Sequence, residues 1–147
     1  MYYLFPIFIL ANENYSNENF AKALESYNNR AFQDSYLAFK EYLKKEKLDS
    51  NLTFILARSA YEIGKFEEAE TLYKELLEQT PNNSRVKLEL AQTYFQQKRY
   101  EEAEVLYQDV LKDNSLPINV RKNIELTLDS LNKKSQRNFL KTTLGFG

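Results

Sequence analysis

The chain has 147 residues, of which 43% are hydrophobic and 28% charged, and its formal net charge is −1. Length and composition predict one globular domain, and the near-neutral charge gives no indication of nucleic-acid binding. There is no Cys and no His, which excludes disulfides and every catalytic or metal site built on a thiol or an imidazole. We therefore expect a protein that is not an enzyme and uses no metal, cofactor or small-molecule substrate.

The N-terminus consists of a run of apolar residues followed by a polar stretch. The run, residues 2–11, is about half the ~20 residues that a helix needs to cross a bilayer. Its length suits the hydrophobic region of a signal peptide, although no basic residue occurs before Lys22. We interpret residues 1–15 as a signal remnant, or a degenerate signal, with a flexible lead. The alternative is an apolar segment that packs on the element after it.

The middle of the chain repeats itself with a period of 34 residues. The stretch KFEEAETLY at Lys65–Tyr73 recurs as RYEEAEVLY at Arg99–Tyr107. A weaker copy lies upstream, at Ala23, Phe32, Ser35 and Phe39. This period is typical of the tetratricopeptide repeat (TPR), a helix-turn-helix unit. It predicts three repeats over residues 16–117, at residues 16–49, 50–83 and 84–117.

The repeats predict an all-α fold, a right-handed TPR superhelix of three helix-turn-helix units with a C-terminal capping helix. Small residues are expected where the two helices of a unit approach closely, namely Ala57, Ala69, Ala91 and Ala103. Gly64 is expected to end a first helix in the left-handed conformation, and Pro81 to end a second helix. Acidic residues open the second helices, and we interpret them as complementing the helix dipole and not as acid-base catalysts. These are Glu67, Glu68, Glu101 and Glu102.

Residues 118–135 are predicted to form the capping helix. Its apolar residues recur at spacings of four, four and three, at Val120, Ile124, Leu128 and Leu131. Such a helix covers the open end of a repeat array. Residues 136–147 contain Thr, Gly and aromatic residues, and we interpret them as a linker and the start of a β-strand. Because a single strand has no ladder to join, we expect Phe139–Gly147 to be flexible or only loosely packed on the capping helix.

In a TPR superhelix the first helices line the concave surface, so repeat position predicts the residues that contact a partner. The predicted binding face consists of Asn17, Phe20, Leu24, Tyr27, Asn28, Asn51, Phe54, Arg58, Tyr61, Glu62, Arg85, Leu88, Gln92, Phe95 and Gln96. Amides can pair with the backbone of an extended polypeptide, and aromatic rings can bury its side chains. We therefore expect the partner to be a polypeptide.

The C-terminal half resembles a known family. The phrase RVKLELAQTYFQQKRYEEAEVLYQDVL, followed by LPINVRKNIELTLDSLNKK and LKTTLGFG, is similar to the corresponding junction in the surface lipoprotein assembly modifier family. The resemblance covers about residues 80–147. Members are outer-membrane proteins of Gram-negative bacteria in which a periplasmic TPR domain precedes a transmembrane β-barrel.

This resemblance implies a periplasmic, protein-binding TPR module that assists the secretion or surface display of client proteins. Its implied partners are a client polypeptide or periplasmic chaperone and the barrel domain of the same protein, which would follow residue 147. The alternative is a stand-alone TPR adaptor, cytoplasmic, that scaffolds a protein complex. A downstream reading frame that encodes alternating strands of about ten residues would favour the first interpretation.

Overall fold

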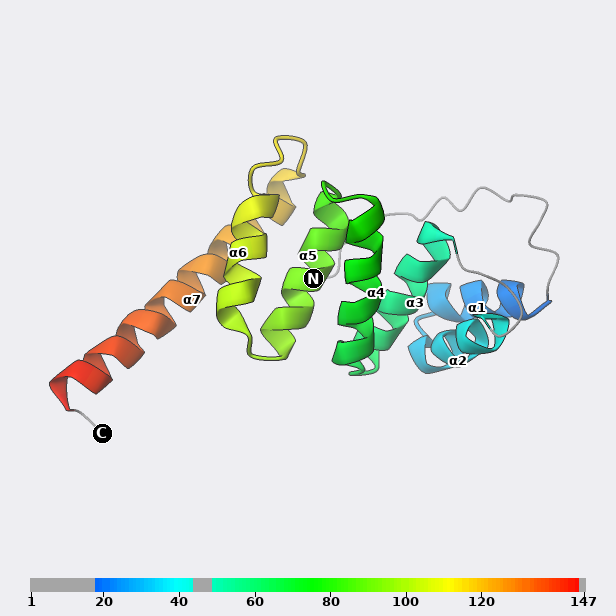
Figure 1. Cartoon of the computed structure of the whole chain (residues 1–147), viewed down its shortest axis with the longest axis horizontal. Coiled ribbons are helices and arrows are strands. Elements are labelled where there is room, and N and C mark those ends of the chain that lie inside the picture. Colours follow the sequence, from blue (N-terminus) through cyan, green and yellow to red (C-terminus); the bar gives the residue numbers. More distant parts are fainter. Residues whose placement is uncertain (1–17, 44–48, 146–147) are drawn as a thin grey trace. The chain divides into compact units, whose positions relative to one another are not determined.

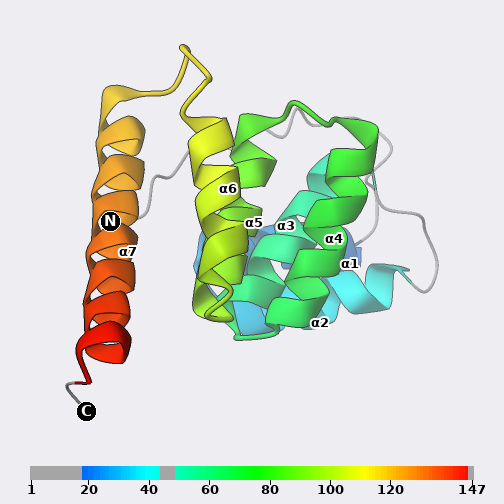
Figure 2. The ribbon, with the colours of Figure 1, turned by 60° about the vertical axis from the view of Figure 1, so that its left-hand side comes forward.

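The computed structural model describes residues 18–43 and 49–145, and these residues contain helices and no strand (Figures 1 and 2). The all-α prediction is therefore confirmed for this part of the chain. The signal remnant expected at residues 1–15 lies outside the described residues. In chain order the helices are α1 (Glu18–Asn28), α2 (Phe32–Leu43), α3 (Ser50–Glu62), α4 (Phe66–Gln79), α5 (Ser84–Gln96), α6 (Tyr100–Val110) and α7 (Ile118–Leu144).

The chain divides into two compact units, residues 1–72 and 73–147, and the division falls within α4. In the first unit, α1 packs against α2 and α2 against α3. Phe20 of α1 lies edge-on to Phe39 at 6.4 Å between ring centroids, and 5.8 Å from the ring of Tyr42. All three rings are buried, so they form the apolar interior of the α1–α2 hairpin.

Each of the three first helices ends in the same turn, and the turns are 34 residues apart. The residues in the left-handed conformation are Arg30, Gly64 and Lys98, with φ of 59°, 79° and 62°. At each turn the next residue donates its backbone N–H to the carbonyl five residues earlier, as Lys65 does to Ala60 at 2.9 Å. This pattern is the Schellman motif, which satisfies the last carbonyls of a helix. The sequence predicted it only at Gly64, because Arg and Lys rarely adopt positive φ.

The starts of α3 and α5 also match. Asp49 accepts a hydrogen bond from the backbone N–H of Leu52 at 2.9 Å, and Asn83 accepts one from Val86 at 3.2 Å. Such side chains satisfy N–H groups that have no partner inside the helix. Period, caps and turns together set each hairpin locally, from the residues of its own repeat and the one residue before it.

The predicted small positions lie inside the hairpins. Ala57 and Ala69 of the first unit are completely buried, as are Ala91 and Ala103 of the second. Ser35 occupies the corresponding place in α2, where it accepts a hydrogen bond of 3.2 Å from Ser59 of α3. Larger side chains at these places would have to displace a neighbouring helix.

In the second unit, α5 packs against α6 and α6 against α7. Val120, Ile124 and Leu131 are the buried side chains of α7. Arg121 fixes the loop before α7, because its guanidinium donates to the carbonyls of Leu111 and Asp113, both at 2.8 Å. The loop is therefore tied to the packed half of α7 by two hydrogen bonds from the Arg121 side chain to backbone carbonyls.

The interpretation of the last residues was wrong. Residues 136–144 continue α7 as a helix of 27 residues, so the capping helix does not end at residue 135 and no strand begins at Phe139. The helix ends at Gly145, whose φ of 67° is left-handed. Helix is favoured because it pairs backbone groups within the segment, whereas a strand needs a neighbour. Residues 146–147 lie outside the described part.

Among the described residues, no helix combines the length and the apolar character that crossing a membrane requires.

Candidate functional site

The structure separates the predicted binding face into buried and accessible residues. Phe20 and Phe54 are buried, with 4% and 9% of their surface exposed. They contribute to the interior and not to an accessible face. Asn17 lies outside the described residues. The remaining twelve residues lie on α1, α3 and α5 and are half-buried or exposed: Leu24, Tyr27, Asn28, Asn51, Arg58, Tyr61, Glu62, Arg85, Leu88, Gln92, Phe95 and Gln96.

Three of the predicted aromatic residues have an intramolecular role that the sequence analysis missed. Each packs edge-on against the aromatic residue five positions later, across the turn of its hairpin. The pairs are Tyr27–Phe32, Tyr61–Phe66 and Phe95–Tyr100, with centroid separations of 5.7, 5.6 and 5.4 Å. The first ring of every pair is half-buried, so part of it remains accessible. The recurrence of both aromatic positions at 34 residues was the signal for these pairs.

In the first unit, three predicted residues come together in the last turns of α3. Arg58 and Glu62 form an ion pair of 2.5 Å, and the Arg58 guanidinium lies 5.3 Å from the centroid of the Tyr61 ring. Both charged side chains are largely buried, at 13% and 16% exposed. The Tyr61 ring therefore lies next to both the Phe66 ring and the Arg58 cation. Asn51 lies exposed at the opposite end of α3.

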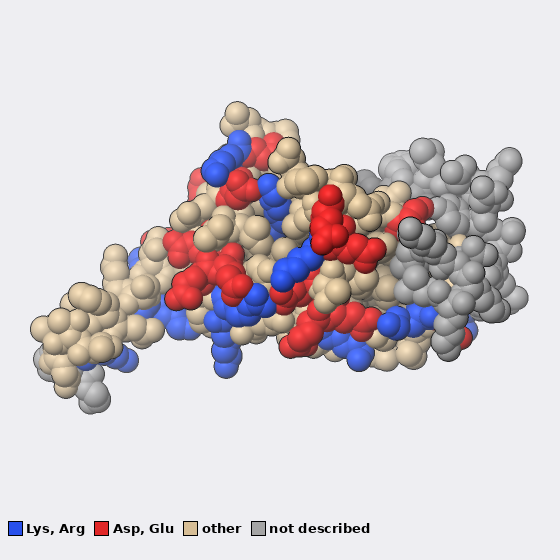
Figure 3. Space-filling view, viewed as in Figure 1, with Lys and Arg blue, Asp and Glu red and all other residues tan. Residues whose placement is uncertain are grey.

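In the second unit, α5 presents amide groups beside an aromatic ring. Gln92 and Phe95 are half-buried and Gln96 is exposed. Lys87 of the same helix pairs with Asp109 of α6 at 2.5 Å, which ties the two helices of this hairpin together. Charged side chains of both signs are interspersed over these helices on the face shown in Figure 3. The last turns of α5 therefore combine a partly accessible ring with amides.

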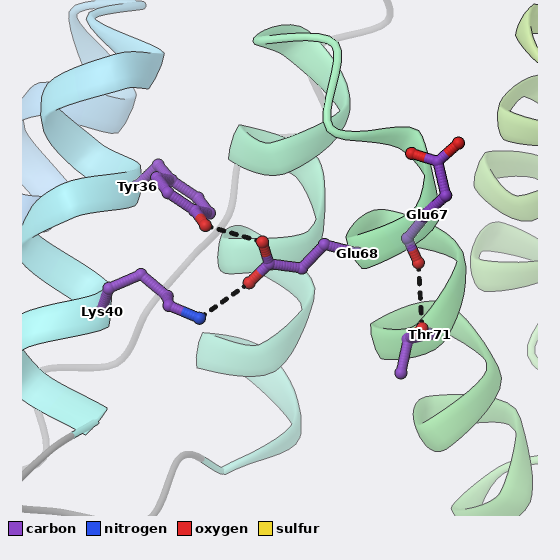
Figure 4. A network of polar contacts seen from close by, with 5 residues as sticks. All are labelled: Tyr36, Lys40, Glu67, Glu68 and Thr71. Atoms are coloured by element: carbon purple, nitrogen blue, oxygen red, sulfur yellow. Dashed lines mark hydrogen bonds and ion pairs between the residues drawn. The ribbon is translucent and has the colours of Figure 1, made fainter.

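A polar network on the second helices was also missed. Tyr36 of α2 donates its hydroxyl to one carboxylate oxygen of Glu68 at 2.6 Å, and Lys40 donates to the other at 2.9 Å (Figure 4). Lys65 lies 5.4 Å from the centroid of the Tyr36 ring. Figure 4 also shows Thr71, whose hydroxyl donates to the backbone carbonyl of Glu67. Glu68 thus joins α2 to α4, beyond the dipole role inferred from its place at a helix start.

Burial and the Glu68 hydrogen bond together raise the pKa of Tyr36 to about 12. Burial alone would raise the pKa of Glu68, but the hydrogen bonds from Tyr36 and Lys40 outweigh it and lower that pKa. Both shifts favour a neutral phenol that donates to a charged carboxylate. These groups stabilise the packing of the second helices.

The second unit has a related arrangement around Tyr94 of α5. The guanidinium of Arg99 lies 4.2 Å from the centroid of this ring, and Lys74 of α4 lies 5.8 Å from it. Arg99 also pairs with Glu102, and that ion pair lowers the pKa of Glu102. Among the residues that the structure describes, no group of three acidic side chains is placed to hold a metal ion.

Comparison with known proteins supports the repeat assignment. The family model of the tetratricopeptide repeat matches residues 60–117. No curated protein matches the chain. The fold is similar to that of the type III secretion translocator chaperone SycD of Yersinia enterocolitica, with a TM-score of 0.70 and 16% identity over 80% of this chain and 83% of that chain.

The fold is also similar to that of PcrH from Pseudomonas aeruginosa, with a TM-score of 0.65 and 15% identity over 78% of this chain and 89% of that chain. PcrH in complex with the chaperone binding region of PopD gives a TM-score of 0.69 and 15% identity, over 84% and 96%. At these identities the likeness shows the fold alone. The chain thus contains tetratricopeptide repeat sequence and has an all-helical, TPR-like fold.

Proposed function

We propose that the chain is a protein-binding module whose first helices contact an extended polypeptide. The observation that carries this proposal is the recurrence of one half-buried ring at the same repeat position, at Tyr27, Tyr61 and Phe95. Each ring is held edge-on by its partner across the turn. A held ring offers an apolar contact without losing rotational freedom when a ligand binds.

The neighbours of these rings suit a peptide backbone. Gln92 and Gln96 lie one turn before and one residue after Phe95, and both side-chain amides can donate and accept hydrogen bonds. Burying one apolar side chain of the ligand against a ring contributes about 1.5–3 kcal/mol before ordering costs. Rings with adjacent amides therefore favour an extended segment that alternates apolar and polar contacts.

Similar folds supply independent support for the class of partner. PcrH has been crystallised with the chaperone binding region of PopD and also with that of PopB. In those complexes a protein of this fold holds a segment of another protein. The same class of ligand, a polypeptide segment, is what we propose for this chain.

A set of overlapping, unstructured peptides, screened for binding by fluorescence anisotropy, would test the proposal. The peptide that binds most tightly is selected for comparison of variants. We expect the double variant Gln92→Ala, Gln96→Ala to bind the selected peptide at least tenfold more weakly, because two backbone partners are removed. Its thermal midpoint should be unchanged. The matched control is Gln108→Ala on α6, whose side chain is exposed on a second helix. Equal affinity of the folded double variant and the wild type would show that α5 is not the contact surface.

A finer proposal concerns where the module acts. The sequence resemblance over residues 80–147 supports a periplasmic module of an outer-membrane protein, which assists secretion or surface display with a client or a periplasmic chaperone as partner. The helix through Leu144 removes one feature of that resemblance, the strand start. Fractionation of the natural host by osmotic shock, with the protein tagged in its own gene, would test the location. Recovery in the cytosol would instead favour the stand-alone adaptor.

A further inference from the structure

The C-terminal part of α7 extends past the hairpin on which the helix packs. Lys134 marks the limit, since its ammonium lies 4.2 Å from the ring centroid of Tyr100, the first residue of α6. Every described residue beyond Leu131 is exposed. Residues 135–144, here called the projecting segment, therefore have no helix of their own unit to cover them (Figure 1).

The projecting segment carries an unusual share of exposed apolar surface. Seven large hydrophobic side chains are exposed among the described residues, and three of them fall within six positions, at Phe139, Leu140 and Leu144. Together with Gln136 and Thr143 they have the spacing i, i+3, i+4, i+7 and i+8, which places them on one side of a helix. We call these five residues the exposed stripe.

The exposed stripe is not a continuation of the packing face. At 100° per residue, it lies about 150° around the helix from the buried side chains Val120, Ile124 and Leu131. A longer α6 could therefore not cover it. The stripe faces away from the hairpin on which α7 packs, and it needs another explanation than the interior of this unit.

Basic residues accompany the stripe. Residues 130–147 contain Lys133, Lys134, Arg137 and Lys141 and no acidic residue. Arg137 and Lys141 follow Lys134 at spacings of three and four, so the three cations flank one side of the stripe. On the face shown in Figure 3, the projecting end of α7 shows basic and uncharged side chains and no acidic ones.

We propose that the projecting segment binds the surface of an anionic phospholipid membrane. The helix would lie in the plane of the interface, with Phe139, Leu140 and Leu144 at the acyl boundary and the cations among the head groups. Charge complementarity favours this occupant over a second copy of the chain, because two such segments would set the cations Arg137 and Lys141 of one copy against those of the other. A planar surface can also reach the stripe, because the segment extends beyond its own hairpin.

Vesicle flotation of the full chain would test the proposal. We expect binding to vesicles of three parts phosphatidylcholine to one part phosphatidylglycerol and none to phosphatidylcholine alone. Binding should weaken as salt rises from about 50 to about 500 mM, because exposed charges are screened. The variant Phe139→Ser, Leu140→Ser, Leu144→Ser and the variant Arg137→Gln, Lys141→Gln should each lose at least tenfold in affinity.

The packed half of α7 supplies a matched control. The variant Lys122→Gln, Leu126→Ser changes one exposed cation and one equally exposed apolar residue, and it should bind as the wild type does. Equal losses in this control, or no binding to the anionic vesicles, would overturn the proposal. So would two other findings: a lipid-free dimer that the triple Ser variant abolishes, or binding to polyglutamate with no binding to vesicles. The first would assign the stripe to a second copy and the second to an acidic protein.

Discussion

Tyr36 of α2 donates its hydroxyl to the carboxylate of Glu68 in α4 over 2.6 Å, although the two residues are 32 positions apart. Tyr36 is buried, and Lys40 binds the other oxygen of the same carboxylate. The bond joins the second helix of one repeat to the second helix of the next within the first unit. Each repeat supplies one partner, so the contact forms only when the two hairpins have packed.

Tyr36→Phe should destabilise the protein by about 1–2 kcal/mol at neutral pH, because Glu68 loses a donor in a partly buried place. The difference from wild type should be constant from neutral pH up to about pH 10 and shrink between pH 10 and about 12. In that range the unfolded tyrosine ionises while the folded one, with its pKa raised to about 12, still holds its proton.

At acid pH the same difference should also shrink. The pKa of Glu68 is lowered from 4.5 in the folded state, so its contribution is complete above pH 4.5 and is lost as pH falls through the lowered value. Urea unfolding of both proteins over a pH series would measure these changes. Tyr100→Phe serves as the control, because it keeps the ring contact with Phe95. A difference that does not vary with pH would contradict the assignment of the bond.

The left-handed turns predict opposite effects for two substitutions. Gly64→Ala should cost about 1–2 kcal/mol, since φ is 79° and an added Cβ meets no atom within 4 Å, which leaves backbone strain as the cause. Lys98→Gly, at φ 62°, should stabilise by about 0.5–1 kcal/mol. Lys98→Ala keeps the strain and should give no gain. Thermal midpoints that fall for Lys98→Gly would show that the side chain compensates for its backbone.

The completely buried alanines predict overpacking. Ala69→Leu and Ala103→Leu should each destabilise by about 1–3 kcal/mol, because three additional carbon atoms must fit between packed helices. Ala21→Leu is the control, since Ala21 is exposed on α1. Urea midpoints would measure the effect. If the buried variants matched the exposed one, the helix pairs would not be as closely packed as the structure has them.

Removing the projecting segment should lower the helix content of the protein without lowering its stability. Ending the chain after Lys134 should reduce the circular dichroism at 222 nm in proportion to the residues lost. The free energy of unfolding should stay nearly unchanged, because the side chains of residues 135–145 are exposed. Ending it after Pro117 should destabilise strongly or cause aggregation, since Val120, Ile124 and Leu131 are then lost from the surface of α6. A large loss in the first truncation would mean that the segment has a packing partner.

The sequence by itself determined the hairpins of this protein. Helix period, the small residues at Ala57 and Ala69 and the turn at Gly64 act within one repeat, and the caps at Asp49 and Asn83 act on the helix that begins at the next residue. Interactions over a few residues decide them, so a period of 34 residues is sufficient to place the helices. The edge-on ring pairs could have been predicted in the same way, because their members are only five residues apart.

Only the tertiary structure decided which aromatic residues remain accessible. Phe20 and Phe54 have the same repeat position as Leu88, yet both rings are buried whereas Leu88 is half-buried. Burial depends on what the rest of the unit packs against a position. Tyr36 and Glu68 illustrate the same limit, because neither residue indicates a partner 32 positions away.

At the last residues, the local composition favoured a structure that the chain does not adopt. Thr, Gly and aromatic residues favour a strand, but strand propensity expresses packing against neighbours more than a preference of the backbone. Residues 136–144 have no described strand beside them and continue α7, whose backbone hydrogen bonds lie within the helix itself. Composition therefore set the local tendency at this end, and the available hydrogen-bond partners decided the structure.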